Sequence, residues 1–140
     1  MPRAEASALV HRTGQPGYTE SLPRVPASAA AARRLVRLAL ACWRLDVFAE
    51  DAALIVTELV ANTVQHARRE SIRVTVTRLG REAVRIGVVD FSKAPPQRRD
   101  TNGTVEDGRG LAVVEHLSAA WGTEPLPWGK RVWAELRGGQ

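Results

Sequence analysis

The sequence has little of what several large protein classes require. Its single cysteine, Cys42, cannot form an internal disulfide, which favours a reducing compartment. Its apolar runs are far shorter than the ~20 residues of a membrane-spanning helix. The N-terminal stretch also lacks the apolar segment of a signal peptide. These absences predict a cytoplasmic protein without a membrane partner.

Lysine is also scarce. Lys93 and Lys130 are the only two, so the formal net charge of +5 comes mostly from arginine. The arginines are spread along the chain, whereas a nucleic-acid binder typically gathers basic residues on one face with aromatics between them. We therefore expect no direct nucleic-acid partner. DNA binding through arginines stays open as an alternative, which a salt-dependent affinity would reveal.

The motifs of three common cofactor sites are missing. The histidines His11, His66 and His116 lie far apart and, with one cysteine, give no zinc-ligand spacing. There is no Gly-x4-Gly-Lys-[Ser/Thr] sequence, which excludes a Walker-type phosphate loop. Gly108-x-Gly110 lacks the third glycine and the preceding strand of a dinucleotide fingerprint.

Length and periodicity predict one α+β domain. Residues 1–17 are polar, contain glycine and proline, and are expected to form a flexible tail before a domain at 18–140. The apolar pattern predicts a two-layer α/β sandwich, with helices packed on one face of a mostly antiparallel mixed sheet. The expected elements are a strand at 18–22, a helix from Ala27, a helix from an Asp46 N-cap to about 67, strands at 72–79 and 83–90, a helix from Gly108 to about 120, and strands at 121–124 and 131–136.

The same pattern predicts which side chains are buried. The expected core residues are Leu35, Val36, Leu38, Ala39 and Cys42 of the first helix, Phe48, Leu54, Ile55, Leu59 and Val64 of the second, Leu111, Val114 and Leu117 of the third, and Trp43, Trp121 and Trp133. Residues 91–107 lack an apolar period, and a loop of this length inside a compact domain is often a functional lid.

A polar stripe runs along the second helix. Glu58, Asn62 and His66 recur every four residues, so each is rotated by only about 40° from the one before. A carboxylate, an amide and an imidazole on an otherwise apolar helix must face either water or a ligand. Motifs elsewhere in the chain indicate whether this stripe faces water or a ligand.

These residue types suit magnesium-assisted phosphate chemistry. Mg²⁺ needs few protein ligands when a nucleotide supplies phosphate oxygens, so the amide oxygen of Asn62 could place it. Glu58 could accept a proton from a nucleophile, and the backbone N–H groups at Gly108–Gly110 could bind phosphate. Asp90 could accept a hydrogen bond from an exocyclic amine such as that of adenine. Each signal alone also fits a solvated helix face, a loop or a turn.

The combination resembles a known superfamily. Three stretches look like the N, G1 and G2 boxes of GHKL-type ATPases: Glu58-Leu-Val-x-Asn62-x-Val-x-His66-Ala67, Val89-Asp90, and Glu106-Asp-Gly-Arg-Gly-Leu111 followed by Trp121-Gly122. Within the superfamily, the chain is most similar to the single-domain anti-sigma factor kinases of bacteria. The ending Gly129-Lys130-x-Val132 also resembles theirs.

The resemblance implies the Bergerat ATP-binding fold and a set of residue roles. Asn62 would be the Mg²⁺ ligand, Glu58 the catalytic base and Asp90 the partner of the adenine amino group. The phosphate lid would be lined by Gly108, Arg109, Gly110 and Leu111, and Lys130 would either reach a phosphate or be a turn lysine. For His66, a role in capping or packing is preferred over catalysis.

The resemblance also implies the activity and its partners. The chain would use ATP and Mg²⁺ to phosphorylate a serine or threonine of an antagonist (anti-anti-sigma) protein, and would control a sigma factor by partner switching, as a homodimer. The alternative is an ATP-binding interaction module with little kinase activity, because Phe91-Ser92-Lys93-Ala94-Pro95 stands where the G1 box usually has glycines.

Overall fold

The computed structural model describes residues 6–10, 15–66, 70–91 and 108–138. Side chains are described for these except at 6–10, 66 and 108–110. The elements are β1 (Ala6–Val10), β2 (Pro16–Pro23), α1 (Ser28–Cys42), a 3-10 turn η1 (Asp46–Phe48), α2 (Ala49–His66), β3 (Ser71–Gly80), β4 (Ala83–Asp90), α4 (Gly108–Leu117), β5 (Ala120–Leu126) and β6 (Gly129–Arg137).

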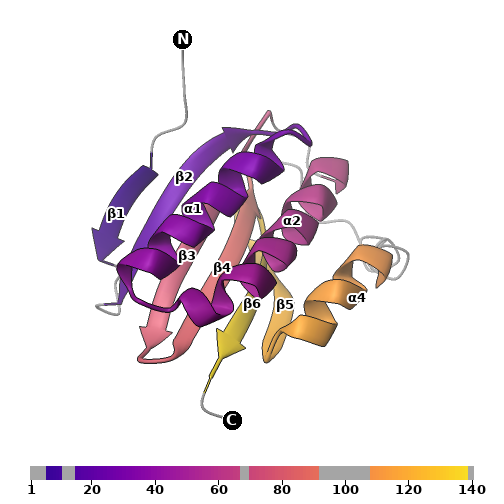
Figure 1. The fold of residues 1–140 in the computed structure, drawn as a ribbon. Helices are drawn as coiled ribbons and strands as arrows, with labels where there is room; N and C mark the ends of the chain where they lie inside the picture. Colours follow the sequence, from indigo (N-terminus) through magenta and orange to yellow (C-terminus); the bar gives the residue numbers. More distant parts are fainter. Residues whose placement is uncertain (1–5, 11–14, 67–69, 92–107, 139–140) are drawn as a thin grey trace.

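The described strands form one sheet, in the order β1-β2-β3-β4-β6-β5, with α1, α2 and α4 on one face (Figure 1). The predicted two-layer α+β sandwich is confirmed. The predicted mixed sheet is wrong, because every described pair of neighbouring strands is antiparallel. Two successive helices, α1 and α2, return the chain to the end of the sheet where β2 finished. Helix α4 leads to β5, and β6 then turns back between β5 and β4.

The N-terminal segment differs from the expected tail. Ala6–Val10 form β1, which pairs antiparallel with β2 from Ala6 opposite Glu20 to Val10 opposite Pro16. The predicted absence of regular structure is therefore wrong for these five residues. Backbone pairing with the edge of β2 needs no apolar period in the added strand, so the pattern did not indicate it.

Alternation along the strands divides the sheet into two faces. Val84, Ile86 and Val88 of β4 are fully buried beneath the helices. The residues paired with them on β6 are Leu136, Ala134 and Val132, which are also buried. The core continues from this face of the sheet into the helix layer. The fully buried large side chains are Leu40, Ile55, Leu59, Ile72, Ile86, Val36, Val56, Val60, Val74, Val76, Val84 and Val88.

Three predicted core residues are exposed. Leu38 is 63% exposed and Leu54 is 52% exposed, and the thiol residue Cys42 is also exposed. Leu38 follows buried Val36 by two residues, and Leu54 precedes buried Val56 by two, which is roughly 200° of helical rotation in each case. Hydrophobicity alone had placed these leucines inside, whereas helical rotation places them outside.

Two further local predictions were wrong. Asp46 begins the 3-10 turn η1, and α2 starts three residues later, at Ala49. Trp43 and Trp121 pack against the core as predicted, but Trp133 lies on the opposite face of the sheet, where the Arg85 guanidinium carbon is 4.5 Å from its ring centroid. The amphiphilic ring of tryptophan suits either face, so its identity did not decide the side.

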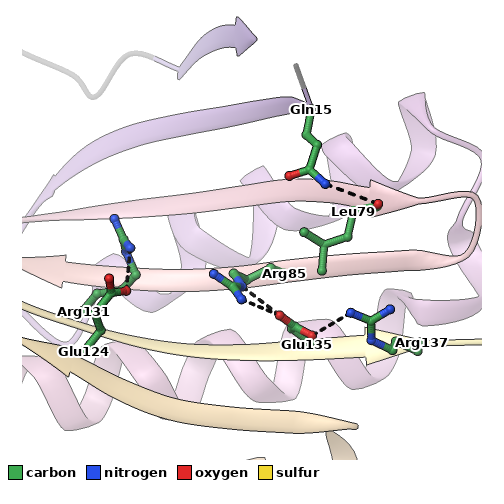
Figure 2. Close-up of polar contacts among 7 residues, drawn as sticks. All are labelled: Gln15, Leu79, Arg85, Glu124, Arg131, Glu135 and Arg137. Carbon is green, nitrogen blue, oxygen red and sulfur yellow. Dashed lines mark hydrogen bonds and ion pairs between the residues drawn. The ribbon is translucent and has the colours of Figure 1, made fainter. Parts of the chain in front are cut away.

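The face of the sheet away from the helices carries an ordered group of charges (Figure 2). Glu135 is buried, with 7% of the residue exposed. Arg85 donates to its Oε2 through Nη2 at 2.6 Å and Nε at 3.0 Å, and Arg137 donates to Oε1 at 3.0 Å. Burial alone would raise the pKa of Glu135, but the hydrogen bonds from Arg85 and then Arg137 lower it below its ordinary value.

This lowered pKa predicts that Glu135 stabilises the fold at neutral pH. A carboxyl group with a depressed folded-state pKa contributes stability above its unfolded-state pKa of about 4.3, and the contribution disappears as pH falls through the folded-state value. We expect Glu135→Gln to lower the unfolding free energy by about 1–2 kcal/mol at pH 7, since both arginine partners are partly exposed. Urea titrations at pH 7 and below pH 4 would measure this.

The difference between wild type and Glu135→Gln should shrink on acidification. Glu124→Gln is the matched control, because Glu124 accepts from Arg131 at 2.8 Å in an exposed pair on the same face. That variant should stay within about 0.5 kcal/mol of wild type. Equal effects of the two variants at pH 7 would contradict the assignment.

Candidate functional site

Segments far apart in the sequence meet at one end of the sheet. Asp90, the last residue of β4, lies opposite Ile72 near the start of β3 and opposite Lys130 near the start of β6. The backbone N–H of Arg24 donates to the carbonyl of Glu70 at 2.7 Å, so the turn after β2 is at this end too. α2 ends and α4 begins on the same side (Figure 1). The end of β4 with Asp90, the start of β6 with Lys130, the end of α2 and the start of α4 therefore lie at one end of the sheet.

Asp90 points into the helix-bearing face. It continues the alternation of Val84, Ile86 and Val88, and it is only 3% exposed. A carboxyl group at this depth costs free energy unless it is hydrogen-bonded, and Asp90 has at least one interaction partner in the fold. A buried acceptor at a strand end, on the helix-bearing face, fits the predicted contact with an amine.

Gly129 makes room for Asp90. A Cβ atom at Gly129 would overlap the carbonyl oxygen of Asp90 and would lie 3.2 Å from its carboxylate oxygen Oδ1. The bare backbone of β6 therefore lies directly against both the main chain and the side chain of Asp90. The sequence contained Gly129 within a motif, but nothing in the motif indicated which residue it accommodates.

Lys130 belongs to the strand and not to the turn. β6 begins at Gly129, one residue before Lys130, and Lys130 is paired with Asp90. Val132, Ala134 and Leu136 of the same strand are buried in the core, so alternation places Lys130 on the helix-bearing face with them. The predicted turn lysine is wrong, and the ammonium group of Lys130 and the carboxylate of Asp90 project from neighbouring strands on the same face.

The polar stripe of α2 faces α4. α2 lies between α1 and α4 (Figure 1), and Arg33 of α1 donates to Thr57 Oγ1 at 3.0 Å, which marks the α1 side of α2. Asn62 follows Thr57 by five residues and is turned from it by about 140°, towards the α4 side. Glu58 and Asn62 are both half-buried. Glu58 and Asn62 thus lie on the side of α2 that is turned away from α1, towards α4.

The start of α4 supplies the remaining predicted residues. α4 begins at Gly108, so Gly108, Arg109 and Gly110 form its first turn, where backbone N–H groups lack helical partners. Leu111 is 4% exposed within the core, so only its backbone is available to a ligand. The predicted lid lies outside the described residues, apart from Phe91 and Gly108 onwards. His66 is the last residue of α2, and its side chain lies outside them as well.

Two contacts that the sequence did not reveal hold the edges of this region. Arg24 donates through Nη1 to the carbonyl oxygen of Val64 at 3.1 Å, in the last turn of α2. A guanidinium at a helix carboxyl end satisfies a free carbonyl and complements the helix dipole. Phe91 stacks on Trp128 of the β5–β6 turn with ring centroids 5.2 Å apart. Together they fix the end of α2 and the residue after Asp90.

The donor set fits magnesium brought in with a nucleotide better than a metal held by protein alone. Within the described ranges, no group of three or more His, Cys, Asp or Glu residues could hold a metal ion. Mg²⁺ commonly takes only one or two protein ligands and completes its shell with water and phosphate oxygens. Asn62 offers one such oxygen, with the carboxylate of Glu58 one turn away along the same stripe.

The comparison with protein families agrees with this arrangement. A family model described as "Histidine kinase-like ATPase domain" matches residues 22–133, which is most of the chain. The chain belongs to this family. The matched range of the histidine kinase-like ATPase domain begins in β2 and ends in β6, so it contains α2, Asp90, α4 and Lys130.

Family membership supports the coarse prediction of an ATP-binding domain of the GHKL superfamily with a Bergerat-type fold. No individually curated protein matches the chain significantly. In the part of the chain that the structure describes, no helix is long and apolar enough to cross a membrane. The roles of single residues therefore rest on the site geometry.

The close approach at Gly129 gives a stability prediction. Gly129→Ala introduces a Cβ into space held by the Asp90 backbone, so we expect it to lower the unfolding free energy by about 2–3 kcal/mol, as for an overpacked core position. Gly80→Ala is the matched control, because a Cβ there meets nothing within 4 Å. Thermal and urea unfolding of both variants would measure the difference. A neutral Gly129→Ala would contradict the described contact.

Proposed function

We propose that the protein is an ATP-dependent serine/threonine protein kinase of the anti-sigma factor type. The observation that carries the proposal is that Asp90, the end of the helix that bears Glu58 and Asn62, and the first turn of α4 lie at one end of the sheet. A nucleotide base, a magnesium-bound triphosphate and a general base need these three kinds of group within one site.

Each part of the site has a task in this proposal. Asp90 accepts a hydrogen bond from the exocyclic amine of adenine, and its burial keeps water from competing for that bond. The free N–H groups of Gly108, Arg109 and Gly110 bind phosphate oxygens at the positive end of α4. Asn62 holds the Mg²⁺ ion, which neutralises charge on the triphosphate when it is bound.

Glu58 is the proposed base. As the hydroxyl oxygen of a serine or threonine bonds to the γ-phosphorus and ADP leaves, Glu58 accepts the hydroxyl proton. A half-buried carboxylate in the helix boundary is oriented by packing yet open to an incoming hydroxyl. Such proton transfer accelerates reactions by about 10²–10⁴-fold.

The partners follow from the type of regulator proposed. In this proposal the acceptor is an antagonist (anti-anti-sigma) protein, and the kinase, as a homodimer in the cytoplasm, releases or retains a sigma factor according to its nucleotide state. Cys42, which is exposed and free, suits a reducing interior. Immobilised protein loaded with ATP or with ADP should retain different partners, which mass spectrometry can identify.

Nucleotide binding can be tested without any partner. We expect Asp90→Asn to weaken ATP binding about 10–100-fold, because a charge-assisted acceptor becomes a neutral amide with competing donors. Calorimetry with Mg²⁺–ATP measures the loss. Asp51→Asn, an exposed carboxylate on α2, should bind as wild type does. Equal affinities for the two variants would reject the role of Asp90.

Phosphotransfer tests the base. We expect Glu58→Gln to lower transfer from radiolabelled ATP to the identified antagonist by at least about 100-fold while ATP affinity is kept. Glu50→Gln, an exposed change on the same helix, is the control and should transfer phosphate normally. Normal transfer by Glu58→Gln would remove Glu58 from the mechanism.

The second candidate is a nucleotide-stabilised interaction module. The sequence after Asp90 favours it, since Phe91, Ser92 and Lys93 stand where the resemblance leads us to expect glycines. Tight ATP binding by wild type, with no transfer to any ATP-dependent partner, would establish this alternative over the kinase.

A further inference from the structure

We propose that Lys130 determines base specificity by donating a hydrogen bond to the N1 ring nitrogen of adenine. Together with Asp90 it forms a donor–acceptor pair that reads the edge of the purine. This inference rests on the proposed ATP binding and adds a protein residue that contacts the base directly.

The first support is the register of the sheet. Lys130 and Asp90 are directly paired across the antiparallel strands β6 and β4. Residues paired in this way project to the same face, with Cβ atoms roughly 4.5–5.5 Å apart. The buried residues Val132 and Val88, next along each strand on that face, show that this is the face covered by helices.

The second support comes from Gly129. The carboxylate oxygen Oδ1 of Asp90 lies 3.2 Å from the position of a Gly129 Cβ, so the carboxylate is close to β6. It therefore lies next to the strand that carries Lys130. Across β3, Asp90 is paired with Ile72.

The third support is the pattern of hydrogen-bonding groups on the base. Adenine presents an amine donor at C6 beside an acceptor at N1. A carboxylate accepts from the amine, and an ammonium group, which only donates, is complementary to N1. Guanine in the same orientation would place its O6 acceptor against Asp90 and its N1–H donor against Lys130. Both contacts would be mismatched, so the pair selects adenine.

Atom-edited nucleotides test this contact. In 1-deaza-ATP a C–H group replaces N1, and in 7-deaza-ATP one replaces N7. We expect wild-type protein to bind 1-deaza-ATP about tenfold more weakly than ATP, the loss of one hydrogen bond to a charged group. It should bind 7-deaza-ATP about as well as ATP. Calorimetry with each nucleotide and Mg²⁺ gives the three affinities.

The variant Lys130→Met completes the test. It should bind ATP more weakly than wild type and should no longer distinguish ATP from 1-deaza-ATP. Arg131→Met is the matched control, because Arg131 is the next residue but pairs with Glu124 on the opposite face of the sheet. It should keep the wild-type preference. Comparing nucleotides within one protein removes any effect of the substitution on stability.

The possible outcomes separate this inference from the proposed function. Equal binding of ATP and 1-deaza-ATP by wild type would overturn the role of Lys130 and leave ATP binding intact. So would a preference that persists in Lys130→Met, or a loss confined to 7-deaza-ATP. If wild type binds none of these nucleotides, the proposed function and the inference both fail.

Discussion

The register between β4 and β6 is the constraint on which the candidate site depends. It sets Asp90 opposite Lys130 and brings the backbone of Gly129 against Asp90. Because side chains alternate between faces, a slip of one residue would turn Asp90 to the face without helices. Such a slip is unfavourable, because it would also move the buried residues Val84, Ile86 and Val88 out of the core. The hydrophobic core therefore fixes the position of a polar group.

The two faces of the sheet use charge differently. On the helix-bearing face, Asp90 at the end of β4 and Lys130 near the start of β6 are paired across neighbouring strands. On the other face, Glu135 is saturated by Arg85 and Arg137, so its charge is compensated within the fold. The ion pairs of Glu135 contribute to stability. In contrast, the buried carboxylate of Asp90, with Lys130 on the neighbouring strand, is placed where a ligand could bind.

The sequence predicted the helices, the strands and the residues of the site. It did not predict which of those residues lie next to one another in the fold. Period-two alternation located β3 and β4, and four-residue recurrence located the Glu58–Asn62 stripe. The pairing of Asp90 with Lys130 could not be predicted, because they are distant in sequence and register depends on the whole sheet. β1 was missed because main-chain pairing leaves no apolar signature. Leu38 was misplaced because composition was weighed above helical rotation.

The irregular part of the sheet lies away from the site. The register of β3 and β4 shifts between Arg78 and Gly80, beside the hairpin that joins them, and the backbone there is held by the Arg78 guanidinium, which donates to the carbonyls of Gly80 and Arg81. A bulge bends a strand and changes which face its residues take. With the bulge confined to the hairpin, pairing is regular from Thr77 opposite Arg85 to Ile72 opposite Asp90. Asp90 thus keeps the orientation that the core residues before it dictate.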